Sequence, residues 1–196
     1  MVAEPILDGR VLRGQRNRQA IVDALLSLYR EGTSDPTAAQ IAERAGVSTR
    51  SVFAHFEDRE ALVAAVSAEM APVLHRLVDP EPPSPVLGDR IMWLAGLRAE
   101  YFEAAQPVIK AALRYVDEQP AIAERMYQDG LVLREQVERV FAPELEARRG
   151  ADGRCCLEAL DTTFSYEVWR RLRTSHRMGV TAAKGIVVHM AHSLLR

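Results

Sequence analysis

The stretch from Thr37 to Leu62, TAAQIAERAGVSTRSVFAHFEDREAL, constrains the fold of this chain more than any other part. Thr37 and Gln40 have the spacing of a capping box, in which a hydroxyl at the N-cap and an amide three residues later each satisfy a backbone N–H group. Gly46 stands where this helix must end with a positive φ, and Ser48 supplies a fresh N-cap. The sequence therefore predicts two short helices joined by a tight turn.

The second of these helices is predicted to turn its first residues outward. Val47, Val52 and Phe56 are apolar and are expected to face the interior of the domain. The side chains left to point outward are then Thr49, Arg50 and Ser51. This is the layout of a helix-turn-helix, whose second helix lies in the DNA major groove with its N-terminal residues at the base edges.

At these residues the chain resembles the TetR family of bacterial one-component repressors, from about Asp8 to Val66. The resemblance covers the basic first helix, the A-G-V-S turn at 45–48, the run V-F-A-H-F at 52–56 and R-E-A-L at 59–62. Phe53 replaces the Tyr that the family usually carries, so it keeps the packing role but loses a hydrogen bond to phosphate. Ala54 replaces a second aromatic residue. The resemblance implies a three-helix DNA-binding head, a helical ligand-binding body and a dimer.

Composition and charge place the chain among globular proteins. Its 196 residues, 48% of them hydrophobic, can bury a core in one domain or two small ones. The first ten residues lack a signal-peptide pattern, and no apolar run approaches the roughly 18 residues of a membrane span, so a cytoplasmic protein is expected. Cys155 and Cys156 are adjacent and would point to different faces of a helix, which favours two reduced thiols over a disulfide.

The distribution of charge fits a nucleic-acid partner better than the net charge of −2 does. Residues 10–59 contain eight arginines against six acidic residues. A run without any acidic residue is formed by Arg10, Arg13, Arg16 and Arg18. Such an arm could follow phosphates or enter a minor groove, and the alternative is a solvated helix start.

Every predicted element is a helix, because alternating strand patterns and Asn-Gly hairpin turns are absent. The first helix is expected over about 13–31, with a core stripe of Ile21, Leu25 and Leu28. A longer helix is expected over 59–78, with Asp58 as its N-cap. Its buried stripe is predicted to consist of Leu62, Val66, Met70, Val73 and Leu77.

The proline-rich segment 79–89 then breaks the chain, since four prolines in six residues cannot continue a helix. About five body helices are predicted to follow, at 86–105, 107–118, 120–141, 152–175 and 181–195, with a short helix or turn between Pro143 and Gly150 and a break with an N-cap at Gly179 and Thr181. The expected architecture is all-α. Residues 1–66 would form the helix-turn-helix domain with its basic arm, and residues 67–196 the ligand-binding and dimerisation domain.

The residues expected to contact DNA divide into two groups. Thr49, Arg50 and Ser51 are the candidates for base reading, where Arg50 could bond a guanine bidentately or, alternatively, hold a phosphate. The candidates for phosphate contacts are Arg16, Thr37, Ser48, His55 and Arg59. A purely structural role remains the alternative for His55. Phe53 belongs to the DNA-binding set by position, although Phe53 and Phe56 are both expected to be mostly core.

One head contacts too few bases for useful specificity, so a two-fold dimer on a palindromic operator is expected. The last two predicted helices carry apolar stripes that could form a four-helix bundle with a partner, or bury against their own protomer. The interface candidates are Leu157, Leu160, Val168, Ile186, Val187, Met190 and Leu194.

Large side chains on the body helices could line a mainly apolar pocket for a small-molecule effector, although each could equally be plain core. These candidates are Trp93, Leu97, Tyr101, Tyr115, Met126, Tyr127 and Phe164. No metal or other cofactor is expected, since His189 and His192 have no Cys, Asp or Glu partner nearby.

The best interpretation is a DNA-binding transcriptional regulator, specifically a repressor released by a mostly apolar ligand. A ligand-independent DNA-binding protein is the first alternative. A helical enzyme is the second, and it is disfavoured because the chain has no phosphate-binding glycine loop, nucleophile elbow or H-E-x-x-H motif.

Overall fold

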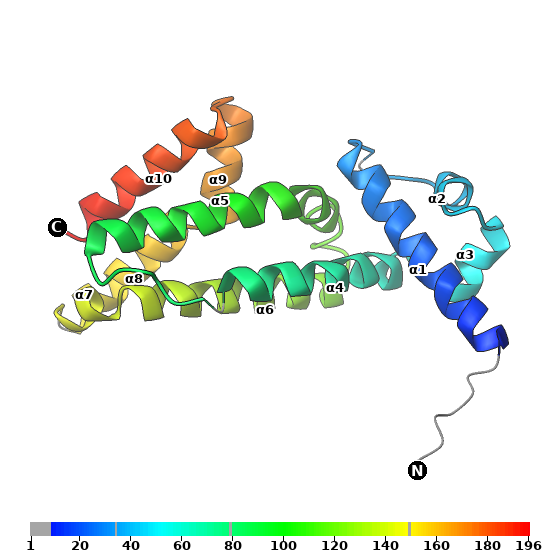
Figure 1. Ribbon diagram of the computed structural model, residues 1–196, viewed down its shortest axis with the longest axis horizontal. Coiled ribbons are helices and arrows are strands. Elements are labelled where there is room, and N and C mark those ends of the chain that lie inside the picture. The colour runs from blue at the N-terminus through cyan, green and yellow to red at the C-terminus, as the bar shows by residue number, and fades with distance from the viewer. Residues whose placement is uncertain (1–8, 34, 79, 149) are drawn as a thin grey trace, which may run out of the picture. The chain divides into compact units, whose positions relative to one another are not determined.

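The computed structural model describes residues 9–33, 35–78, 80–148 and 150–196, and the regular structure within these ranges is entirely helical (Figure 1). This confirms the predicted all-α fold class. Residues 1–8, which belong to the predicted N-terminal domain, and Asp79, which opens the predicted linker, lie outside the described residues.

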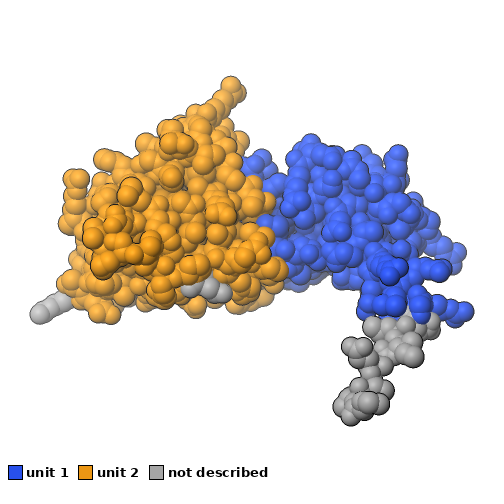
Figure 2. All heavy atoms as spheres, in the orientation of Figure 1, with its two compact units in different colours: residues 1–70, 106–123 blue, residues 71–105, 124–196 orange. Residues whose placement is uncertain are grey.

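The chain divides into two compact units, shown in different colours in Figure 2. Unit 1 comprises Met1–Met70 and Gln106–Ala123, and unit 2 comprises Ala71–Ala105 and Glu124–Arg196. These units are defined by packing. The functional boundary between residues 66 and 67 stays a prediction.

Unit 1 is built on three helices and the first part of a fourth. The helices are α1 (Gly9–Arg30), α2 (Ala38–Ala45), α3 (Thr49–His55) and α4 (Arg59–Val78). The predicted stripe of α1 is confirmed, since Ile21, Leu25 and Leu28 are all buried. The helix extends to Gly9, four residues before the predicted start.

Helix α4 has the predicted bounds and the predicted cap, because Asp58 Oδ1 accepts a hydrogen bond from the backbone N–H of Ala61 at 2.8 Å. One member of its predicted stripe is wrong: Val73 is half-buried, whereas Leu74 is buried. The reason is geometric, since the buried row advances in steps of four residues and 74, not 73, lies above Met70. Pro72 lies inside the helix and leaves one backbone carbonyl without its usual N–H donor.

By length and composition α4 could cross a membrane, which was not expected from the sequence. It has 20 residues and a mean hydropathy of 1.4 over its most apolar window. Core helices of water-soluble proteins meet the same two criteria. Because Leu62, Val66, Leu74 and Leu77 are buried within the protein, we interpret α4 as a core helix.

Unit 2 consists of the last part of α4 and parts of the long helices α5 (Leu87–Ala112) and α6 (Pro120–Val140), together with several shorter elements. These are α7 (Ala142–Glu146), α8 (Ala151–Thr163), α9 (Tyr166–Arg170), the π-helical turn η1 (Arg171–Ser175) and α10 (Val180–Leu194). The prediction that Pro107 begins a new helix is wrong, since α5 continues through it to Ala112. Ala105 and Val108 are buried on either side of Pro107. The free energy of their packing can offset the single backbone hydrogen bond that the proline removes.

The predicted helix 152–175 is also wrong as one continuous element. It is interrupted after Thr163, and Ser165 begins α9 as an N-cap whose hydroxyl oxygen accepts from the N–H of Val168 at 3.3 Å. A serine side chain that bonds to the backbone two or three residues ahead competes with helix continuation, which explains the break. The N-cap of α10 is Gly179 with no side-chain hydrogen bond, so Thr181 is not the cap.

Candidate nucleic-acid interface

The turn between α2 and α3 is fixed by local hydrogen bonds. The capping box is confirmed: the N–H of Gln40 donates to Thr37 Oγ1 at 3.2 Å, and the N–H of Thr37 donates to Gln40 Oε1 at 2.8 Å. Gly46 ends α2 with a φ of 66°, a left-handed conformation that glycine adopts without the steric cost of a Cβ atom. The predicted helix-turn-helix therefore forms from its own local signals.

The start of α3 is held by Ser48, whose hydroxyl oxygen accepts from the N–H of Ser51 at 3.1 Å. Val52 and Phe56 are buried, and Thr49 and Arg50 are exposed, as the sequence predicts. Ser51 is half-buried, and its backbone N–H is the group that bonds to the Ser48 cap. The outward side chains at the start of this helix are thus those of Thr49 and Arg50.

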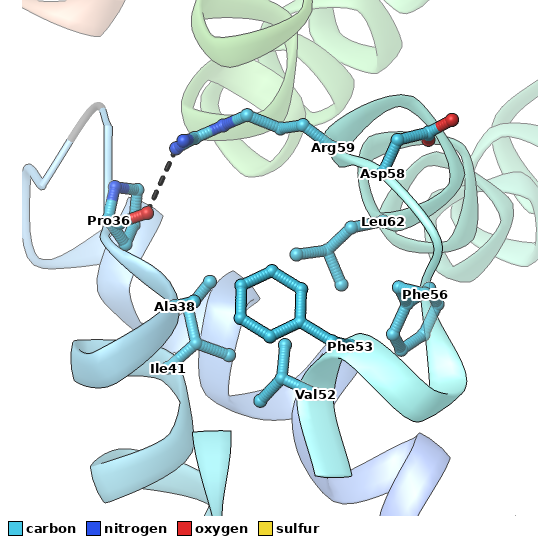
Figure 3. Close-up of a pocket in the computed structure, with 9 residues that line it drawn as sticks. All are labelled: Pro36, Ala38, Ile41, Val52, Phe53, Phe56, Asp58, Arg59 and Leu62. Carbon is cyan, nitrogen blue, oxygen red and sulfur yellow. Dashed lines mark hydrogen bonds between the residues drawn. The ribbon is translucent and has the colours of Figure 1, made fainter. Parts of the chain in front are cut away.

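Phe53 is not a core residue, so this expectation is wrong: 61% of its surface is exposed, against 3% for Phe56. Helix α3 has only seven residues, and Val52 and Phe56, four apart, already fill its inward face. Phe53 lies on a pocket of about 110 Å³ (Figure 3). The pocket is lined by Pro36, Ala38, Ile41, Val52, Phe53, Phe56, Asp58, Arg59 and Leu62.

Arg59 is engaged by groups of unit 1. Its guanidinium forms an ion pair with Asp35, donates to the carbonyl of Pro36 at 2.9 Å, and lies 5.6 Å from the ring centre of Tyr115. The Tyr115 hydroxyl also donates to Asp35 Oδ1 at 3.1 Å. A phosphate contact by Arg59 stays a prediction, and such a contact would compete with these partners.

Tyr29 is influenced by the charges of Arg59 and Asp35. It is buried, and burial raises the pKa of its hydroxyl to about 12. The nearby Arg59 guanidinium acts in the opposite direction and lowers this pKa. The phenol is therefore neutral at physiological pH and adds no charge to the group around Asp35.

The basic helix α1 presents Arg10, Arg13 and Arg16 at the surface. Arg18 is exposed as well, and its guanidinium lies 4.8 Å from the ring centre of Phe56. His55 is half-buried beside α1, where a Cβ atom on Gly14 would approach its ring carbon Cε1 to 3.9 Å. Thr37 and Ser48, the remaining predicted phosphate contacts, are exposed.

The predicted dimer stripes are only partly at the surface. Leu157, Leu160 and Val187 are buried within their own protomer, which is the alternative left open for these helices. Val168, Met190 and Leu194 are half-buried, and Ile186 is 38% exposed. An open groove of about 620 Å³ runs between α8 and α10, with Ala159, Met190 and Leu194 among its apolar lining.

The predicted ligand-pocket residues are spread over several different surroundings in the described part of the chain. Tyr115 lies in unit 1 beside Arg59, and Tyr127 is 60% exposed. Trp93, Leu97 and Met126 are half-buried. Tyr101 packs on Phe102 at 5.5 Å between ring centres, and Phe164 on Phe141 at 5.8 Å. A narrow crevice in unit 2 is lined by Ala95, Arg98, Phe102, Thr163, Phe164, Ser165, Trp169 and Val187. Of the seven candidates, only Phe164 lines it.

Sequence reasoning missed the buried polar side chains of unit 2, namely Arg90, Arg98, Gln136 and Thr163. A signal was present, because Arg98 follows Leu94 and precedes Phe102 at steps of four on the buried row of α5. A charged residue in such a row indicates either a buried partner or a ligand.

Comparison with known proteins supports the helix-turn-helix assignment. The model for bacterial regulatory proteins of the TetR family matches residues 21–66. A transcriptional regulator from Rhodococcus sp. Rha1 has a similar structure, with a TM-score of 0.68, 16% identity and coverage of 93% of this chain and 95% of that chain. No similar sequence was found among curated proteins.

Two further solved structures share the fold. A TetR-family transcriptional regulator from Marinobacter aquaeolei VT8 has a TM-score of 0.69 and 14% identity, covering 91% of this chain and 88% of its own. The multidrug binding protein EbrR, complexed with imidazole, has a TM-score of 0.61 and 18% identity, covering 97% of both chains. At these identities the likeness establishes the fold.

Proposed function

We propose that this chain, which belongs to the TetR family of bacterial regulatory proteins, is a homodimeric repressor that leaves its palindromic operator when a small molecule binds to its body. Its N-terminal domain makes it a DNA-binding transcriptional regulator. Repression, the symmetry of the operator and release by ligand are the proposed parts.

The observation that carries the proposal is the fixed presentation of Thr49 and Arg50. Both side chains are exposed at the start of a helix that is held by the Ser48 cap and by the left-handed turn at Gly46. A guanidinium presented in this way can bond a guanine edge bidentately, which is worth about 1–3 kcal/mol of discrimination. Residues that contact phosphate would then fix the register of α3 in the groove.

We assign the phosphate contacts to Arg16, Thr37, Ser48 and His55, and to Arg59 if its ion pair with Asp35 opens. Phe53 offers an exposed apolar ring in place of a hydroxyl. Its ring would lie against deoxyribose or a thymine methyl group rather than hydrogen-bond to phosphate.

Dimerisation would use the groove between α8 and α10. Met190 and Leu194 leave apolar surface there that one protomer does not cover, and Ile186 is exposed on the same helix α10. A two-fold partner would bury this surface and present two copies of α3 to successive major grooves.

Release by a ligand requires that the ligand bind two conformations with different affinity, and typical coupling is about 1–3 kcal/mol. Helix α4 is the element we assign to this task, because its residues are shared between the two compact units. The similarity in fold to a multidrug binding protein supports a body that accepts small molecules.

The test is selection of bound sequences from a random pool of duplex DNA. We expect two-fold symmetric sites whose half-site centres lie about 34–36 Å apart or a multiple of that distance. Enrichment of sites without two-fold symmetry would contradict the dimer, and no enrichment would contradict sequence-specific binding.

A further inference from the structure

Arg98 is a cation deep inside unit 2. Only 3% of its surface is exposed, and burial lowers the pKa of its guanidinium to about 10, so the group remains charged at physiological pH. Its hydrogen bonds go to neutral acceptors: Gln136 Oε1 at 2.8 Å and the carbonyl of Leu133 at 2.6 Å. Hydrogen bonds to neutral acceptors alone do not offset the free energy that is lost when a guanidinium leaves water, so the burial of Arg98 requires an explanation.

No carboxylate of the described residues forms an ion pair with Arg98. Asp161 acts on it electrostatically without a hydrogen bond between them, and burial raises the pKa of this carboxyl group. The Nε atom of Arg98 is buried and has no hydrogen-bond partner. The guanidinium therefore has one unused donor and no carboxylate bonded to it.

Arg98 lines a narrow crevice between α5, the α8–α9 junction and α10, and Figure 1 shows how these helices are arranged. The crevice is too narrow to hold water, and its apolar walls come from Phe102, Phe164, Trp169 and Val187. The hydroxyl of Thr163 is used, since it donates to the carbonyl of Ala159 at 2.8 Å. The crevice thus combines apolar walls with one cation that has a spare donor.

Gln136 connects Arg98 to the end of α4. While its Oε1 accepts from Arg98, its Nε2 donates to the carbonyls of Leu77 and Val78 at 2.8 and 3.2 Å. The last carbonyls of a helix have no partner within the helix, and this fully buried amide supplies the donor for Leu77, while the Val78 carbonyl also accepts from Arg139 at 2.6 Å. A change at Arg98 can therefore reach the C-terminus of α4 through one side chain.

We propose that Arg98 is the receptor for the carboxylate of a small apolar organic acid, and that this acid is the effector. The carboxylate would take the free Nε–H and a neighbouring guanidinium N–H in a bidentate pair, the geometry that arginine favours. The apolar part would enter the crevice by displacing one of its walls. Moving the Arg98 guanidinium toward the acid would change its bonds to Leu133 and Gln136, and through Gln136 the cap on α4. This inference rests on the proposed function and names its ligand.

Arg90 provides a control within the same helix. It is also buried on α5, and its Nε also lacks a partner, but its guanidinium forms an ion pair with Glu144 at 2.5 Å and donates to the carbonyl of Val140. Its charge is compensated by the protein, so Arg90 needs no anionic ligand.

The first experiment tests three acids, octanoate, benzoate and 4-phenylbutyrate, each paired with its neutral primary amide. Trp169 lines the crevice and is one of only two tryptophans, so a Trp93→Phe variant reports binding through Trp169 fluorescence. Calorimetry on the unmodified protein checks the affinities. We expect at least one acid to bind about ten- to a hundredfold more tightly than its amide. Equal binding of acid and amide, or no binding by any acid, overturns the assignment.

The second experiment compares Arg98→Met with Arg90→Met. Replacing a poorly compensated buried charge by an apolar side chain of similar size is often tolerated, so Arg98→Met should fold. We expect the preference for acid over amide to vanish in Arg98→Met and to persist in Arg90→Met. A preference retained in Arg98→Met overturns the proposal, whatever the stability of either variant.

Operator binding separates this inference from the proposed function. Acid binding that depends on Arg98 but leaves DNA affinity unchanged would retain the anion site and reject ligand release. A protein that selects no DNA sequence but still prefers acids would reject the repressor and retain the site.

Discussion

The two compact units use polar side chains in opposite ways. In unit 1 the polar groups that shape the site lie at helix ends and bond to a backbone N–H three residues away, as Thr37 and Ser48 do. In unit 2 they lie within long helices and bond to groups 35 to 59 residues away, as Arg98 and Gln136 do. Hydrogen bonds between near neighbours in the sequence hold a surface in one conformation. Buried hydrogen bonds between distant helices break and re-form together when those helices move. This difference suits the proposed division into a DNA-binding domain of fixed shape and a body that changes conformation when a ligand binds.

The comparison predicts that Gln136→Leu is the most damaging change. It would remove the acceptor of Arg98 and the donor to the Leu77 carbonyl together, leaving buried polar groups unpaired, while the Val78 carbonyl keeps its bond from Arg139. We expect the free energy of unfolding to fall by about 3–5 kcal/mol, measured by urea denaturation.

Gln128→Leu on the same helix is the matched control. Gln128 is exposed and bonds only to the exposed Glu124, so a change within about 0.5 kcal/mol is expected. Equal losses for the two variants would show that the buried network is not special.

Ile186→Glu should disrupt the dimer without unfolding the protomer, because Ile186 is 38% exposed whereas Leu160 and Val187 are buried in their own chain. We expect sedimentation to show a monomer and operator affinity to fall by about a hundredfold or more, since the second head no longer binds intramolecularly. Thr181→Glu, at the exposed first turn of α10, should leave the dimer intact. A dimeric Ile186→Glu protein would remove this face from the interface.

Gly46→Ala tests the rigid turn in unit 1. A Cβ atom at a φ of 66° is strained, so we expect a loss of about 1–2 kcal/mol in the free energy of unfolding. Gly130→Ala gives the opposite sign, because Gly130 lies inside α6 with open space around its Cα, and a gain of about 0.5–1 kcal/mol is expected. If Gly46→Ala were neutral, the left-handed turn would not hold α2 and α3 together.

The same contrast explains what the sequence could predict. The capping box, the turn at Gly46 and the bounds of α4 are encoded within a few residues, and all were predicted. The exposure of Phe53 depends on how short α3 is, and the pairing of Arg98 with Gln136 depends on how two distant helices meet. Helix breaks were predicted where proline or glycine is decisive. The break predicted at Pro107 is absent, because packing carries α5 through it. The break before α9 was not predicted, because Ser165 supplies a cap inside what looked like one continuous helix.

Helix α3 is predicted to read bases through Arg50, while the surrounding basic residues only position it. The most direct measurement is the affinity of the Arg50→Ala and Arg16→Ala variants for the selected operator and for its single-base substitutions. We predict that Arg50→Ala loses about 1–3 kcal/mol of discrimination at one position per half-site, and that Arg16→Ala weakens all sequences alike with a smaller salt dependence. Uniform weakening by Arg50→Ala, with base preference unchanged at every position, would contradict base reading by this residue.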